Sequence, residues 1–145
     1  MSVRFFTEGV RFSLPKQRKT SSWLNRVAES EGTSIAELNI IFCSDQFLSA
    51  INLKYLRHKS LTDIITFDLG STKKGIKAEI YISKPRVEEN SSVFGTTLDN
   101  EIHRVMVHGL LHLLGYGDKT PRQKAKMRKK EDAYLSLRTG SKGST

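Results

Sequence analysis

Two histidines stand four residues apart in the segment VHGLLHLLGYGDKT, which covers residues 107–120. Positions four apart on a helix differ by about 40° in direction, so His108 and His112 would project from one face, one turn apart. Two imidazoles placed in this way can bind one metal ion. The alternative is that each histidine is separately hydrogen-bonded on a buried helix, but the sharp turn and the carboxylate that follow favour a metal site.

The residues after the pair can supply a third ligand. Gly115 and Gly117 can adopt a positive φ, which lets the chain reverse its direction and return Asp118 toward the histidines. Three protein ligands leave the fourth position of a tetrahedral ion to water, which is typical of a catalytic zinc site. We therefore expect one Zn²⁺ per chain, although two histidines and a carboxylate also suit other divalent ions such as iron(II).

The residue that follows the first histidine limits the chemistry. Zinc peptidases with the motif H-E-x-x-H use the glutamate of that motif as a general base. In this chain the equivalent position is Gly109. The missing base argues against peptide hydrolysis by that mechanism, so a metallopeptidase-like hydrolase is only an alternative interpretation.

Hydrophobic periodicity predicts one α+β domain over residues 1–137, with a small mixed sheet, helices packed on it and a flexible polar tail at 138–145. We predict strands or edge strands at Val3–Phe6, Val10–Leu14, Glu37–Cys43, Thr62–Leu69 and Ala78–Ser83, the last two forming an antiparallel hairpin. We predict helices at Lys16–Glu31, after Ser44, at Leu98–Leu114 and at Pro121–Leu137. The third of these helices carries the histidine pair.

Composition points to a polyanionic partner. The net charge of +9 and the pI of about 9.8 favour RNA or DNA over a membrane surface, because no basic amphipathic anchor accompanies the charge. Basic residues are dense between Lys119 and Lys130, directly after Asp118, although a solvated helix face would have a similar composition. No apolar segment has the length of a membrane span or a signal peptide. Cys43 is the lone cysteine, and we predict that it is a buried strand thiol. We therefore expect a cytoplasmic protein.

Three other residues near the pair have predicted roles. Glu131 either orients a ligand histidine or forms a salt bridge, and both alternatives stay open. For Asp132 we favour a salt bridge with nearby lysines. His103 points well away from His108 around the predicted helix and is not expected to be a ligand.

The segment HGLLHLLGYGD resembles the signature of the YbeY family of bacterial rRNA maturation endoribonucleases, H-G-x-L-H-L-x-G-Y-D-H. The segments INLKYL, LTDIITF and AEIYIS, and the spacing of Met127 and Glu131, are also similar to family patterns, so the resemblance extends over about residues 51–137. Two positions depart from the signature. Gly117 replaces the usual aspartate, and Asp118 replaces the usual third histidine.

The resemblance implies a zincin-like fold and a metal-dependent endoribonuclease that is specific for single-stranded RNA. It also implies a role in ribosome biogenesis, in maturation of the 3′ end of the small-subunit rRNA, with the ribosomal subunit as a partner. His108, which would also be catalytic, His112 and the substituted Asp118 would be the zinc ligands.

Basic residues have the remaining expected roles. The family has an arginine directly after the tyrosine of L-N-x-x-Y-R, but here that place is Leu56 and Arg57 comes one residue later. Arg57 is therefore a candidate catalytic residue that would contact a phosphate. The candidate RNA-binding residues are Lys119, Arg122, Lys126 and Lys129. A further alternative is a non-catalytic ribosome-assembly factor that binds RNA and has a structural metal site.

Overall fold

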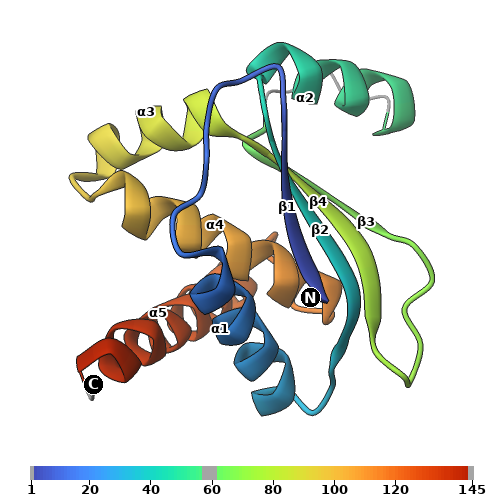
Figure 1. Cartoon of the computed structure of the whole chain (residues 1–145), viewed down its shortest axis with the longest axis vertical. Helices are drawn as coiled ribbons and strands as arrows, with labels where there is room; N and C mark the ends of the chain where they lie inside the picture. Colours follow the sequence, from blue (N-terminus) through green and yellow to red (C-terminus); the bar gives the residue numbers. More distant parts are fainter. Residues whose placement is uncertain (1, 57–61, 144–145) are drawn as a thin grey trace.

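The computed structural model describes residues 2–56 and 62–143 of the 145-residue chain (Figure 1). Its elements, in chain order, are β1 (Val3–Glu8), α1 (Gln17–Ser30), β2 (Ile35–Cys43), α2 (Asp45–Ile51), the π-helix η1 (Asn52–Leu56), β3 (Ile64–Asp68), β4 (Ile76–Ser83), α3 (Lys84–Phe94), α4 (Leu98–Leu113) and α5 (Pro121–Gly143).

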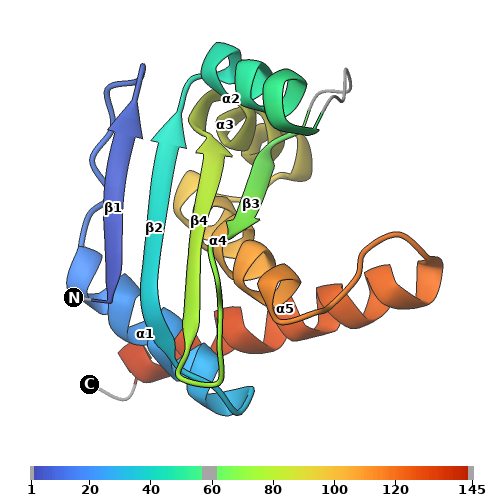
Figure 2. The ribbon, with the colours of Figure 1, turned by 90° about the vertical axis from the view of Figure 1, so that its right-hand side faces the viewer.

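The four strands form one mixed sheet in the order β1-β2-β4-β3 (Figure 2). Strands β1, β2 and β4 are parallel, and β3 pairs with β4 in the antiparallel direction. The predicted hairpin is therefore confirmed, as is the prediction of an α+β fold with a small mixed sheet. The N-terminal strand β1 lies at one edge of the sheet, as expected.

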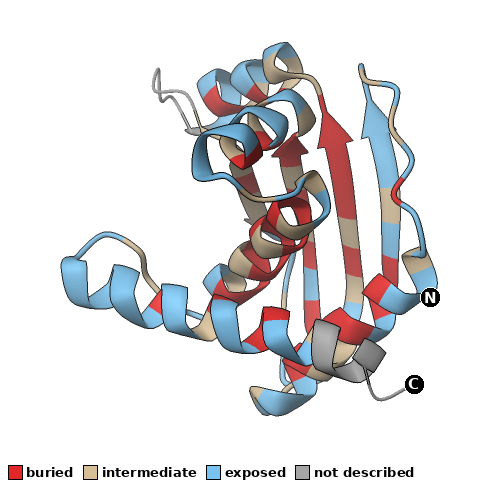
Figure 3. Ribbon diagram, turned by 90° about the vertical axis from the view of Figure 1, so that its left-hand side faces the viewer, coloured by how far each residue is buried: buried red, intermediate tan, exposed pale blue. Residues whose placement is uncertain are grey.

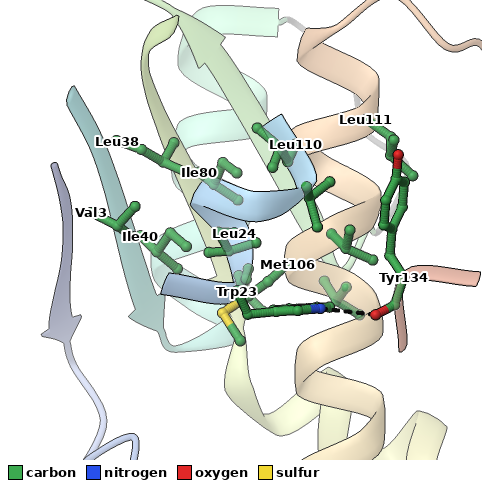
Figure 4. Close-up of a cluster of buried hydrophobic side chains, with 14 of the residues drawn as sticks. Val3, Trp23, Leu24, Leu38, Ile40, Ile80, Met106, Leu110, Leu111 and Tyr134 are labelled. Atoms are coloured by element: carbon green, nitrogen blue, oxygen red, sulfur yellow. Dashed lines mark hydrogen bonds between the residues drawn. The ribbon is translucent and has the colours of Figure 1, made fainter. Parts of the chain in front are cut away.

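Alternate residues of each strand face two different layers. In β2, Leu38, Ile40 and Phe42 belong to the main core, which the sheet forms with α1, α4 and α5. Ile41 and Cys43 belong instead to a smaller cluster with Leu48 of α2, on the other side of the sheet. Figure 3 shows the burial of α4 against the sheet, and Figure 4 shows the main core at Trp23, whose indole donates a hydrogen bond to the carbonyl oxygen of Tyr134 at 2.8 Å.

Residues 10–14 do not form the predicted strand. Their apolar side chains pack onto the sheet from an irregular segment instead: Leu14 is buried, and the Phe12 ring meets the Phe42 ring edge-on with centroids 5.0 Å apart. The prediction of a strand at residues 10–14 is therefore wrong. The final helix, α5, also continues to Gly143, beyond the predicted end at Leu137.

A side chain caps α2, and the predicted burial of Cys43 is confirmed. The Ser44 hydroxyl accepts a hydrogen bond from the backbone N–H of Phe47 at 3.1 Å and so caps α2. Cys43 is fully buried, and this burial raises the pKa of its thiol to about 12. Within residues 2–56 and 62–143, no helix is both long enough and apolar enough to cross a bilayer.

Candidate metal centre

Helix α4 presents the histidine pair at the edge of the core. Its first turn is capped by the Thr97 hydroxyl, which accepts from the N–H of Asn100 at 3.0 Å, and carries the acidic residues Asp99 and Glu101. Both features stabilise a helix at its positive end. Apolar residues of α4 face the sheet and fix the helix, so His108 and His112 project together from its partly exposed side.

The two imidazoles are held through their Nδ1 atoms. Nδ1 of His108 lies 2.6 Å from Glu131 Oε2, and Nδ1 of His112 lies 3.0 Å from the Tyr116 carbonyl oxygen. A carboxylate and a carbonyl can only accept, so both Nδ1 atoms carry the proton and donate. In neutral rings this leaves the Nε2 lone pairs of both histidines available to a metal ion.

The Asp118 carboxylate lies against both Nε2 atoms. Its Oδ2 is 3.3 Å from Nε2 of His108, and its Oδ1 is 3.9 Å from Nε2 of His112. Ligand atoms of a tetrahedral zinc site, with bonds of about 2.0–2.1 Å, are about 3.3–3.4 Å apart. The first separation fits such a site and the second exceeds it by about 0.5 Å.

Among the described residues, no group of three His, Cys, Asp or Glu side chains already has the spacing of a complete metal site. The donor types and the directions of the side chains nevertheless fit a divalent ion. The Asp118 side chain is about one-third exposed, so it is not locked in place by the core.

The two glycines of the turn have different roles. Gly115 adopts φ of +104°, which reverses the chain after α4, as predicted. Gly117 does not have a positive φ; a Cβ atom there would lie 2.7–2.8 Å from side-chain atoms of Gln123. Gly117 therefore permits the close approach of Gln123, whose Oε1 accepts the N–H groups of Lys119 and Thr120 at 3.1 Å each.

Gly109 lies about 80° around α4 from the direction shared by His108 and His112, on the side that faces the sheet. A Cβ atom at this position would lie 2.9 Å from Cδ1 of Ile64 and 3.1 Å from Cδ1 of Ile80. The helix thus approaches the sheet closely here. A side chain at position 109 would point into the core, so this scaffold offers no room there for the glutamate of the peptidase motif.

Glu131 combines the two roles left open by the sequence. Its second carboxylate oxygen, Oε1, accepts from Arg104 at 2.9 Å, and the same arginine donates to Asp132 at 2.6 Å. Asp132 is thus a salt-bridge residue, but its partner is Arg104 and not a lysine. Burial alone would lower the pKa of His108, yet the hydrogen bond and charge of Glu131 and the charge of Asp118 outweigh it, and the pKa is raised.

A second carboxylate, that of the mostly buried Glu31 directly after α1, holds the turn through Tyr116. Glu31 accepts the Tyr116 hydroxyl at 2.6 Å, the Tyr134 hydroxyl, and the Lys130 ammonium at 3.0 Å. Burial raises the pKa of this carboxyl, but the hydrogen bonds from Tyr116, Tyr134 and Lys130 lower it further than burial raises it. Because the Tyr116 carbonyl holds His112, Glu31 is connected to the site through one residue.

The other predicted residues fall into three groups. Lys119, Arg122, Lys126 and Lys129 are all exposed, and the last three are spaced four and three residues apart on one face of α5. Arg57 lies outside the described residues. His103 is buried, with Nδ1 2.7 Å from the Asp99 carbonyl and Nε2 3.2 Å from the Thr20 hydroxyl, so these two contacts engage both ring nitrogens away from the candidate site.

The fold and the site together define a class of protein. It is a small α+β protein with a four-stranded mixed sheet, and its candidate metal centre combines two histidines of one helix with a carboxylate from the turn that follows. The chain belongs to the endoribonuclease YbeY family, whose sequence profile matches residues 8–138.

Individual relatives agree with this assignment. The chain is 47% identical to the endoribonuclease YbeY of Cytophaga hutchinsonii over 137 residues, which cover 94% of this chain and 96% of the relative. It is 43% identical to the protein of the same name from Amoebophilus asiaticus, with 92% and 91% covered. The solution structure of TM1509 from Thermotoga maritima is similar with a TM-score of 0.63 at 25% identity, covering 97% of this chain and 92% of that one.

Proposed function

We propose that this chain is a zinc-dependent endoribonuclease that cleaves single-stranded RNA and takes part in maturation of the 3′ end of the small-subunit rRNA. Membership of the endoribonuclease YbeY family supports the cleavage of RNA. One observation supports the metal dependence. The Asp118 carboxylate lies 3.3 Å from Nε2 of His108 and 3.9 Å from Nε2 of His112, while Nδ1 of each histidine donates to a protein oxygen. His108, His112 and Asp118 would hold the ion in a zincin-like arrangement.

The residues of the chain have defined roles in this proposal. Glu131 and the Tyr116 carbonyl fix the tautomer and the direction of the two imidazoles. A divalent ion bound there would stabilise the negative charge that develops on the phosphoryl oxygens during cleavage. Asp118 adds a negative charge to the ligand set, so the site would carry a smaller net positive charge than a three-histidine site.

The exposed basic residues would hold the RNA backbone. Lys119, Arg122, Lys126 and Lys129 start beside Asp118 and continue along α5, so contacts with phosphates at this face would position the strand without reading its sequence. Binding of RNA should therefore weaken steeply with increasing salt. We propose in addition that Arg57 contacts a phosphate, that the protein acts on a ribosomal subunit, and that it works in the cytoplasm.

Two alternative functions make different demands on the candidate metal centre. A metallopeptidase-like hydrolase needs a general base next to the histidines, and the close packing of Gly109 on Ile64 and Ile80 leaves no room for one at that position. An RNA-binding assembly factor with a structural metal site would keep the basic face and the ion but would not cleave RNA.

Purified protein should be assayed for bound zinc and for cleavage of a single-stranded RNA, together with three site variants and a control. His108→Ala and Asp118→Ala should lose both zinc and cleavage. Asp118→His, which restores the family's usual ligand, should keep both. The control Asp132→Asn removes an exposed carboxylate outside the ligand set and should behave like the parent.

Two results would contradict the proposal. Cleavage by both alanine variants at the rate of the parent would exclude a catalytic metal at this site. Salt-dependent RNA binding by all variants, without cleavage by the parent, would favour the assembly factor.

A further inference from the structure

A second concave surface lies away from the histidine pair, among helix α1, the first half of α4 and the C-terminal part of α5. It is a cavity of about 750 Å³, which is within the range of about 300–1,000 Å³ that is typical of small-molecule sites. His103 contributes to its wall, and on α4 this residue points about 140° away from His108. The cavity is therefore separate from the candidate metal centre.

The charged side chains that line the cavity are almost all cationic. They are Lys16, Arg18, Lys19, Arg26, Arg138 and the carboxylate Asp99. Five positive charges and one negative charge leave an excess of four. Asp99 accepts from Arg138 at 2.7 Å, so the one carboxylate is already engaged by a member of the set.

The deepest residues of the cavity are fixed and already hydrogen-bonded. Thr20, Trp23 and His103 are almost fully buried, and the Thr20 hydroxyl lies 3.2 Å from Nε2 of His103. The Trp23 ring contacts the His103 ring edge-on, with centroids 5.6 Å apart, and its N–H is bonded to Tyr134, as Figure 4 shows. A ligand would therefore meet a preformed floor below a basic rim in which Lys16, Arg18 and Lys19 are exposed.

Two features at the rim point to an anionic ligand. Within the described chain, Nε of Arg138 is buried and has no hydrogen-bond partner, and an unmet donor of this kind is costly unless an acceptor approaches it. Helix α1 begins at this wall with neither a side-chain cap nor an acidic residue in its first turn, so the positive end of its dipole adds to the basic charge.

We propose that this cavity binds phosphate groups, supplied either by a free nucleotide or by a strand of RNA. Phosphate matches the cationic excess, and arginine side chains can bind it in a bidentate manner. The proposal does not depend on the endoribonuclease activity, because none of the lining residues belongs to the candidate metal centre. Either idea can therefore fail without affecting the other.

The test compares two double variants that each remove two positive charges. Arg18→Gln/Lys19→Gln changes the rim, where both side chains are exposed and glutamine preserves helix propensity. Lys73→Gln/Lys74→Gln changes exposed residues of the loop between β3 and β4 and serves as the control. Binding of ATP and of a single-stranded RNA 12-mer would be measured by calorimetric titration at low ionic strength, after equal melting temperatures confirm folding.

We expect the rim variant to bind at least one probe roughly tenfold more weakly than the control variant does, as the loss of charge-assisted hydrogen bonds implies. Weaker binding of ATP would identify a free nucleotide as the source of the phosphate, and a change confined to the 12-mer would identify RNA. The single variant Lys19→Gln should lie between the parent and the double variant. Equal affinities of the rim and control variants for both probes, or no binding of either probe by the parent, would overturn the proposal.

Discussion

Replacing Glu131 with glutamine tests how the candidate metal centre is oriented. In the parent, one carboxylate oxygen receives Nδ1–H of His108 at 2.6 Å and the other receives Arg104 at 2.9 Å, in a nearly buried position. Glutamine has almost the same shape but only one acceptor oxygen. Its NH₂ group must therefore face either His108 or Arg104, both of which are donors.

The size of the effect follows from these contacts. Loss of a partner that orients a ligand histidine typically lowers metal affinity by about 10–100-fold, which corresponds to about 1.4–2.7 kcal/mol. The matched control is Asp132→Asn, which also changes a carboxylate bound to Arg104 but does not touch His108. Because Asp132 is mostly exposed, we expect the zinc affinity of the control to stay within about twofold of the parent.

Zinc affinity would be measured by titration against a competing chelator, alongside thermal melting of each metal-free variant. A selective loss of affinity in Glu131→Gln is the expected result. Equal loss in both variants would place the effect in Arg104 and not in His108. Parent-like affinity in both would refute the role of Glu131 in orienting the site.

Three further predictions concern the core and the pH response. Gly109→Glu should lower the free energy of unfolding by more than about 3 kcal/mol, measured by urea denaturation, because it places a carboxylate between α4 and the sheet; an unchanged midpoint would show that the helix can move away. The Cys43 thiol, with its pKa raised to about 12 by burial, should react with iodoacetamide at pH 8 only after unfolding, and fast labelling of the native protein would contradict its burial. Burial lowers the pKa of His103 from its ordinary value of 6.5, a shift that the nearby charge of Arg138 increases and that the carbonyl and carboxylate of Asp99 oppose. Below about pH 6.5 the unfolded chain therefore binds a proton at His103 that the folded chain does not, so the free energy of unfolding should fall as pH drops below about 6.5. His103→Gln should reduce this dependence on pH in denaturation curves taken from about pH 7 to pH 5.

Local sequence patterns predict those elements of the fold whose structure is determined by a few neighbouring residues. The spacing of Trp23, Leu24, Val27 and Ala28 predicts α1, and the short glycine-containing loop predicts the hairpin of β3 and β4. The pair at i and i+4 likewise predicts that the two histidines share a face, and Gly115 predicts the reversal that follows. The strand prediction for residues 10–14 was wrong because apolar side chains can pack against a sheet without their backbone joining it.

Contacts between distant segments could not be predicted. Glu31 meets Tyr116 across 85 residues and Tyr134 across 103, and nothing near Glu31 in the sequence marks it as a part of the site. Arg104 and Glu131 meet across 27 residues. Glu131 was a candidate because it lies on the predicted helix that follows the metal motif, but the sequence left its two alternative roles open. The role of Gly117 depends on Gln123, a contact that only the folded turn creates.

Helix α5 also links the candidate site to a projecting part of the chain. Its first turns stand out from the rest of the chain, while its middle is fastened to α4 by Glu131 and to α1 by Tyr134 and Lys130 (Figure 2). Gln123 in the first turn accepts the N–H groups of Lys119 and Thr120, so the backbone next to Asp118 is bonded to the projecting end of the helix. A molecule that displaces this end would shift Asp118 relative to the histidines. By reciprocity, an ion bound at Asp118 would change the affinity of the projecting helix for that molecule.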